Sequence, residues 1–323
     1  MINFFPVTFV AVAEPWPLDQ SRNLSEYLRP DEETALLIPR KCWDGTFLMV
    51  VVRSSIPNWA QRTAIRESWA LWLGRPNFTL NFGQLVMSVN DEITPKFLQF
   101  DSKLAHKLVF LIGRELHSNQ PNIYIMKEQY LNEDLLMEDF VDSYQNLTLQ
   151  SCFILKYIRN KCPGAKYVAT MDDDMFLNLP GLQNQLLHDK SLPDKLVMGR
   201  LLCNSRPVRD PTDKLYCPDH MFTGDIYPNY VSGRGYVISG NLIPRLLEAA
   251  LVTPLFHMED IYITGILTAK IGVRPTDSVG FSHEDRDANP CLLQVGYWFL
   301  LSGTIQALPD TALSRREPQH TGE

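Results

Sequence analysis

The sequence predicts an α/β fold, with a Rossmann-like, mostly parallel sheet flanked by helices. Three stretches, residues 47–52, 108–113 and 167–171, are short, continuous and apolar. Such runs are typical of parallel strands that are covered on both faces. Stretches that suit helices separate them, and this alternation indicates a doubly wound sheet.

The other elements follow from local signals in chain order. Helices are expected over residues 59–72, 124–130, 147–159, 182–188 and 241–250, and a further strand over residues 195–199. Residues 227–239 are expected to turn back into a strand. Within them Gly233 and Gly235 can adopt positive φ or allow close approach of the backbone to a ligand, although a plain turn is the alternative.

Composition and charge bound the class of protein. The 323 residues are 45% hydrophobic and 21% charged, which is ordinary for a globular enzyme with a sizeable core. The net charge of -7 and the lack of a long basic run argue against nucleic acid as a partner. We expect an N-terminal segment and stem or linker over residues 1–40, a catalytic domain over 41–305 and a disordered tail over 306–323.

The N-terminus and the cysteines bear on the compartment. Residues 4–13 are apolar but too short to span a bilayer, so they can be a short signal, the remnant of an anchor or a packed segment. Sequons at Asn23, Asn77 and Asn146 favour the secretory pathway. Six cysteines allow disulfides or buried thiols, and Cys203 with Cys217 is the expected bridge.

Three consecutive carboxylates follow the run at 167–171. Asp172, Asp173 and Asp174 repel one another and cannot all be buried without partners. At the end of a strand their oxygens can bind a hard divalent cation, which typically takes one or two carboxylates plus substrate phosphate. An acidic surface turn is the alternative.

Two further clusters can carry chemistry. Arg62 and Arg66 lie one helical turn apart, so they can clamp a diphosphate or simply be solvated. Glu259 and Asp260 precede a stretch with helical apolar spacing. They can cap the helix and complement its dipole, or one of them can take a proton from a nucleophilic hydroxyl.

These motifs, in this order, resemble the β-1,3-glycosyltransferases of glycosyltransferase family 31, which includes β-1,3-galactosyltransferases and β-1,3-N-acetylglucosaminyltransferases. The resemblance runs from about Phe47 to Val273. It is carried by the segments 52–55, 61–69, 138–144, 146–149, 162–167, 172–174, 227–239 and 259–262.

The resemblance implies a GT-A fold and an inverting β-1,3-hexosyltransferase that moves galactose or N-acetylglucosamine from a UDP-sugar. The acceptor would be a glycan on a glycoprotein or glycolipid. The site would lie in the Golgi lumen, with membrane association through an N-terminal anchor that this sequence does not display. Asp174 and Asp172 match the motif for Mn²⁺, and Asp260 matches the general base. The matching donor-site positions are Arg53, Arg62, Arg66, Asp142, Asp172, Asp173, Gly233, Gly235 and Glu259.

Three departures from the family pattern stand out. Gln150 replaces a common lysine, and Arg234 interrupts the usual run of glycines. The position nine residues after Cys291, where members typically carry a metal-binding histidine, is Leu300; His283 is an uncertain substitute. These departures motivate an alternative, a catalytically weak homologue that binds a nucleotide sugar or glycan without turnover.

Overall fold

A computed structural model describes most of the proposed catalytic domain. The described residues are 16, 20–73, 101, 104–118, 120–281 and 299–301. The expectations for residues 4–13, Asn77, His283, Cys291 and the tail after residue 305 lie outside this part of the chain. Within it, no helix combines the length and the apolar character that a membrane span needs.

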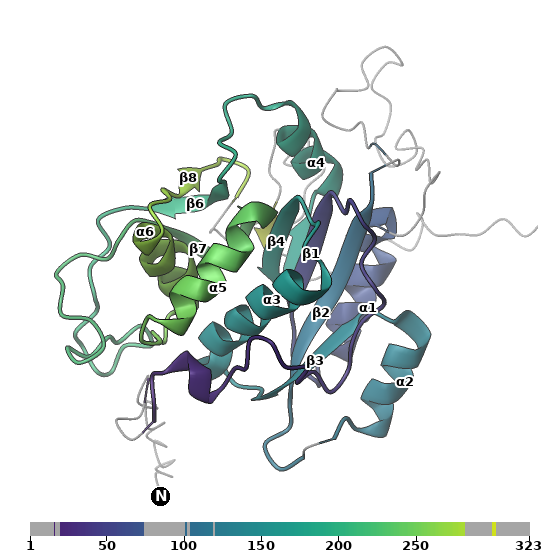
Figure 1. The fold of residues 1–323 in the computed structure, drawn as a ribbon, viewed down its shortest axis with the longest axis horizontal. Coiled ribbons are helices and arrows are strands. Elements are labelled where there is room, and N and C mark those ends of the chain that lie inside the picture. The colour runs from purple at the N-terminus through teal and green to yellow at the C-terminus, as the bar shows by residue number, and fades with distance from the viewer. Residues whose placement is uncertain are drawn as a thin grey trace, which may run out of the picture.

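A seven-stranded sheet lies at the centre of the fold (Figure 1), in the order β3-β2-β1-β4-β7-β6-β8. The strands are β1 Leu48–Arg53, β2 His106–Arg114, β3 Leu135–Val141, β4 Tyr167–Asp172, β6 Val197–Leu202, β7 Tyr230–Ser239 and β8 Thr276–Asp277. Strand β7 is antiparallel to both of its neighbours, and all other neighbouring pairs are parallel. The predicted α/β class with a mostly parallel sheet is therefore confirmed.

Helices cover both faces of this sheet. They are α1 Trp59–Glu67, α2 Ile123–Asn132, α3 Leu147–Lys161, α4 Leu179–His188, α5 Ile243–Leu251, a π-helix Ile261–Leu267 and α6 Thr268–Lys270. Helices α3 and α5 lie side by side on one face (Figure 1) and share one buried core with alternate residues of β1, Met49 and Val51. Val50 and Val52 point to the second core, with α1 and α4. This alternation explains why β1 is a continuous apolar run.

Some boundaries differ from the predicted ones. The helix expected over residues 59–72 divides into α1 and a 3₁₀ helix, Trp69–Leu73. Strand β3 was not predicted, because Glu138 and Asp139 interrupt its apolar pattern. Glu138 is nevertheless buried, and it accepts a hydrogen bond from the Thr34 hydroxyl at 2.7 Å with the Lys156 ammonium 3.9 Å away. A buried carboxylate with such partners can occupy a core-facing strand position.

The stretch expected to be a stem or linker packs on the domain. Trp16, Leu24 and Leu28 are buried in the core that also contains α3 and α5. The Arg22 guanidinium donates a hydrogen bond to the Leu255 carbonyl at 2.7 Å. Leu37 pairs with Met137 of β3 in an antiparallel bridge, so this segment also covers an edge of the sheet.

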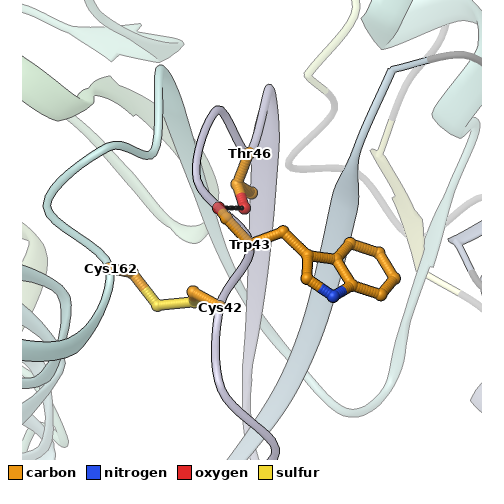
Figure 2. Close-up of a disulfide and its surroundings, with 4 residues drawn as sticks. All are labelled: Cys42, Trp43, Thr46 and Cys162. Atoms are coloured by element: carbon orange, nitrogen blue, oxygen red, sulfur yellow. Dashed lines mark hydrogen bonds between the residues drawn. A yellow bond between two sulfur atoms is a disulfide. The ribbon is translucent and has the colours of Figure 1, made fainter.

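The disulfide joins Cys42 to Cys162 (Figure 2), and the predicted bridge between Cys203 and Cys217 is wrong. Cys203 is exposed and Cys217 is buried, and both are free thiols. Cys42 precedes β1 and Cys162 precedes β4. Because these two strands are parallel neighbours, their amino ends bring the two cysteines together across 120 residues of sequence.

Candidate active site

A cavity of about 570 Å³ opens at the carboxyl ends of β1, β2, β3 and β4. Its volume lies in the range of small-molecule sites, and ligands of doubly wound sheets bind at this edge. The residues that line it are Arg53, Ser54, Ser55, Ile56, Pro57, Asn58, Arg114, Glu115, Leu116, Asp142, Ser143, Leu147, Gln150, Asp172 and Asp173.

The three consecutive aspartates at the end of β4 have different surroundings. Asp173 is buried and accepts hydrogen bonds from the Ser54 hydroxyl at 2.6 Å and from Asn58 Nδ2 at 2.9 Å. Asp174 is exposed, and the Asp172 side chain keeps 43% of its surface exposed. Asp173 therefore anchors the turn after β1, while Asp172 and Asp174 remain accessible from solvent.

Asp172 and Asp174 are the residues that could hold a divalent cation. Although part of the Asp172 side chain is exposed, the surrounding protein desolvates its carboxylate and raises its pKa to about 6; Arg53 opposes this rise, whereas the charge of Asp174 adds to it. A cation relieves such repulsion between carboxylates. Among the described residues, no group of three or more His, Cys, Asp or Glu side chains is arranged to hold a metal. The pair fits a hard cation that takes its remaining ligands from phosphate and water.

Arg53, the last residue of β1, joins the two acidic clusters. Its Nε donates to Asp172 Oδ1 at 2.9 Å, and its Nη1 lies 2.7 Å from Glu259 Oε2. Its Nη2 donates to the Gly233 carbonyl. Only 4% of the side chain is exposed, so the guanidinium is occupied by protein groups although Arg53 borders the cavity. Burial lowers the pKa of Arg53, but Asp172 and Glu259 more than offset this and raise it.

Asp260 lies at the start of the π-helix Ile261–Leu267. Its Oδ1 accepts a hydrogen bond from the Ile261 amide at 2.9 Å, and its Oδ2 accepts one from the Gly233 amide at 3.2 Å. Burial raises the pKa of Asp260 to about 6; the charge of Glu259 adds to the rise, and the two amides oppose it. A carboxyl group with a pKa raised in this way can exchange a proton closer to neutral pH than an ordinary aspartate.

The π-helix is tied to β7, which fixes the direction of Asp260. The Thr264 hydroxyl donates to the Asp260 carbonyl at 2.6 Å and accepts the Val231 amide of β7 at 3.0 Å. A Cβ atom on Gly265 would lie 3.1 Å from the Tyr230 Cβ, so the glycine allows this helix to approach the strand closely. π-Helical segments often occur at functional sites.

Gly233 and Gly235 lie in extended backbone within β7 rather than in a turn. Among the described glycines, positive φ occurs at Gly45 and Gly272 only, so the first of the two alternatives for Gly233 and Gly235, positive φ, does not occur. Close approach is the reason for Gly233, since a Cβ atom there would lie 3.2 Å from the Asp260 Cβ. The glycine lets its amide reach the Asp260 carboxylate.

The structure does not place Arg62 and Arg66 at the cavity. The Arg62 side chain is fully buried, pairs with Glu128 at 2.7 Å and donates to the Ser54 hydroxyl at 3.0 Å. Arg66 pairs with Glu128 and Asp134, each at 2.8 Å. Arg62 therefore supports the turn that lines the cavity, while Arg66 joins α1 to α2 and the start of β3.

Asp142 and Gln150 line the cavity on the side of β3 and α3. Gln150 Nε2 lies 3.4 Å from Asp142 Oδ1. Burial raises the pKa of Asp142, and hydrogen bonds from Ser55 and Ile56 oppose that rise. Directly after Asp174 in the sequence, β5 Met175–Leu177 pairs with β9 Phe299–Leu301, with Leu300 opposite Phe176. A leucine therefore stands close in the fold to the acidic turn that ends at Asp174.

The sequence does not single out four further residues of the site, although Ser54 and Tyr236 lie in segments that carry the family resemblance. Ser54 and Asn58 hold Asp173, and Ser151 and Tyr236 donate to Glu259. Serine, asparagine and tyrosine are common in turns and on half-buried surfaces. Only the tertiary fold shows that these four contact the acids.

A known protein family and several curated proteins are similar to this chain. Residues 94–279 match the family model described as galactosyltransferase. Human beta-1,3-galactosyltransferase 1 is 29% identical over 246 residues, which cover 76% of this chain and 67% of that protein. Mouse N-acetyllactosaminide beta-1,3-N-acetylglucosaminyltransferase 2 is 32% identical over 268 residues, which cover 81% of this chain and 60% of that protein.

Two glycosyltransferases are among the solved structures that match this chain. One acts in the glycosylation of the major capsid of PBCV-1; it has a TM-score of 0.38 and 9% identity, covering 80% of this chain and 95% of its own. The other, bifunctional WbbM, has a TM-score of 0.40 and 10% identity, covering 85% and 48%. The family model alone matches more than half of the sequence, and this chain therefore belongs to the galactosyltransferase family of glycosyltransferases.

Proposed function

We propose that this protein is an inverting β-1,3-hexosyltransferase, which moves galactose or N-acetylglucosamine from a UDP-sugar to a glycan hydroxyl. The observation that carries the proposal is the link between the two acidic clusters. Arg53 contacts Asp172 directly, and through the Gly233 carbonyl it reaches the glycine whose amide binds Asp260. This chain of contacts supports the proposal that one carboxylate group serves the donor's cation and a neighbouring one serves the acceptor's proton. The names of the relatives support the β-1,3 linkage.

The donor would bind in the cavity at the strand ends, with its diphosphate toward Asp172 and Asp174. Mn²⁺ held by these two carboxylates would supply Lewis-acid stabilisation of the negative charge on departing UDP. Asp142 and the Ser54–Asn58 turn line the remainder of the cavity and would position the nucleotide. Asp173 and Arg62 would keep that turn rigid, because both bind Ser54.

Asp260 would act as the general base. Its carboxylate takes the proton from the acceptor 3-hydroxyl, and that oxygen attacks the anomeric carbon from the face opposite UDP. The bond from the anomeric carbon to the diphosphate oxygen breaks as the new glycosidic bond forms, so the configuration inverts in one displacement. The amides of Gly233 and Ile261 hold the carboxylate in one orientation during this step.

The rate should depend on pH through Asp260. A base works only when deprotonated, and the pKa of this carboxyl group is raised from 3.8 to about 6. Activity is therefore expected above about pH 6 and should be lost as the pH falls through that value. We would measure kcat/KM for the acceptor at saturating donor and Mn²⁺ from pH 4.5 to 8. A rate that stays constant down to pH 4.5 would contradict this assignment.

The function itself is tested by release of UDP. Purified protein is incubated with UDP-galactose or UDP-N-acetylglucosamine, a panel of glycan acceptors and Mn²⁺, and UDP is measured with and without EDTA. We expect acceptor-dependent release with one of the donors, and loss of release when EDTA removes the cation. Mn²⁺-dependent UDP binding without turnover for any donor and acceptor would instead support the alternative, a catalytically weak homologue. The leucine at position 300, in place of a metal-binding histidine, motivates that alternative. Absence of both release and binding would exclude the donor site as proposed.

We place the enzyme in the lumen of the secretory pathway, in the Golgi. The Cys42–Cys162 disulfide suits an oxidising compartment. Asn23 is exposed at the start of a 3₁₀ helix, whereas the Asn146 side-chain amide donates to the Val141 carbonyl at 2.7 Å. Asn23 is thus the better placed of these two sequons for a glycan. Endoglycosidase sensitivity that Asn23→Gln removes would support this compartment.

A further inference from the structure

We propose that Glu259 is a positioning residue, which holds Asp172 on the donor side and Asp260 on the acceptor side in register through Arg53. This inference rests on the proposed function, because it assigns roles within the same site. Glu259 would not touch the donor, since only 4% of its side chain is exposed and both of its carboxylate oxygens are bound by protein side chains.

Glu259 is held by three donors from three different elements. Its Oε1 accepts the Ser151 hydroxyl of α3 at 2.6 Å and the Tyr236 hydroxyl of β7 at 2.6 Å. Its Oε2 lies 2.7 Å from Arg53 Nη1 of β1. All four side chains are buried. A buried charge with this many partners is fixed in position, and loss of one partner is costly because the charge stays buried.

Arg53 connects the fixed Glu259 carboxylate to both Asp172 and Asp260. The other two guanidinium nitrogens of Arg53 donate to Asp172 Oδ1 and to the Gly233 carbonyl. The amide of the same glycine donates to Asp260 Oδ2. Movement of Glu259 would therefore shift the guanidinium, and with it both the carboxylate proposed to bind the cation and the strand that orients the base.

Two pairs of matched substitutions separate this role from general stability. Tyr236→Phe and Ser151→Ala each remove a hydroxyl that binds Glu259. Tyr27→Phe removes a half-buried hydroxyl, remote from the site, that donates to the Ser21 carbonyl at 2.6 Å. Ser239→Ala removes a buried hydroxyl that accepts the Leu196 amide at 2.9 Å. Neither control touches Glu259, Arg53 or an acid of the site among the contacts of the described residues.

Three quantities are measured for each variant. They are kcat, the donor KM at saturating Mn²⁺ and the Mn²⁺ concentration at half-maximal rate, with the melting temperature alongside. We expect Tyr236→Phe and Ser151→Ala to lower kcat about tenfold and to raise the half-maximal Mn²⁺ concentration, as is usual for a lost hydrogen bond to a charged group. The donor KM should stay within about twofold.

The controls should lower the melting temperature by a similar amount and leave kcat and the Mn²⁺ requirement unchanged. The proposal is overturned if the controls lower kcat as much as the test variants do. It is also overturned if kcat or the Mn²⁺ requirement stays at the wild-type value in both test variants. If the wild-type protein transfers no sugar, the proposed function fails first. Mn²⁺-dependent UDP binding by calorimetry then tests the Asp172 arm alone, and unchanged binding in Tyr236→Phe contradicts it.

Discussion

Asp260→Asn is expected to lower kcat by about 10²- to 10⁴-fold, the usual contribution of a general base, while UDP binding stays close to wild type. Asparagine has nearly the same shape but cannot take the acceptor proton at any pH used in the assay. One of its two terminal atoms can still accept an amide hydrogen, from Ile261 or Gly233, so the start of the π-helix should be kept. Single-turnover transfer and UDP calorimetry would measure the two effects separately.

The control for this variant is Asp277→Asn. Asp277 is a surface aspartate of β8 that accepts the Leu201 amide at 2.9 Å and lies 3.7 Å from Arg200. It loses the same charge outside the site, so its kcat should equal that of wild type. Equal kcat in Asp260→Asn and Asp277→Asn would refute the assignment of the base. Loss of UDP binding in Asp260→Asn would show instead that this carboxylate serves the donor.

Removing the disulfide should give the largest loss of stability. The double variant Cys42→Ser/Cys162→Ser is expected to lower the free energy of unfolding by about 2–5 kcal/mol, as is typical of native disulfides. The bond closes a loop across 120 residues, so its loss frees much of the unfolded chain. Denaturant unfolding followed by tryptophan fluorescence would measure the change.

Cys203→Ser is the matched control, because Cys203 is an exposed free thiol. Its unfolding midpoint should equal that of the wild-type protein. If the double variant unfolds at the same denaturant concentration as Cys203→Ser, the disulfide does not stabilise the fold. Reduction of the wild-type protein before unfolding should give the same unfolding midpoint as the double variant. Reduced Cys203→Ser should also unfold at that midpoint, because reduction breaks its Cys42–Cys162 bond as well.

The fold could be predicted where burial on both faces leaves a simple pattern. Strands β1, β2 and β4 read as continuous apolar runs, and their alternation with helices indicates a parallel sheet. Strand β3 could not be predicted, because a core position in it holds Glu138, whose partners Thr34 and Lys156 are distant in sequence. The disulfide escaped for a similar reason, since pairing of β1 with β4 decides which cysteines meet.

The sequence predicts the acidic residues of the candidate site, but it does not predict which charged residues face a ligand and which face other protein groups. Clustered carboxylates at the end of a strand or helix stand out in any sequence, and resemblance to a family orders them further. Whether an arginine faces a ligand depends on its tertiary partners. Arg62 and Arg66 meet Glu128 in the protein interior, and Arg53 meets Asp172 and Glu259. No local pattern distinguishes these arginines from ones that bind phosphate.

The packing of the N-terminal segment has a practical consequence for recombinant production. Arg22 binds the carbonyls of Met221 and Leu255, of which Leu255 lies shortly before the acidic pair at the π-helix. Leu24 and Leu28 are buried in the hydrophobic core. A truncation at residue 40, the boundary that a stem would suggest, would strip these side chains from the interior. The exposed apolar surface would promote aggregation. Secreted versions for crystallisation or enzymology should therefore start upstream of Trp16.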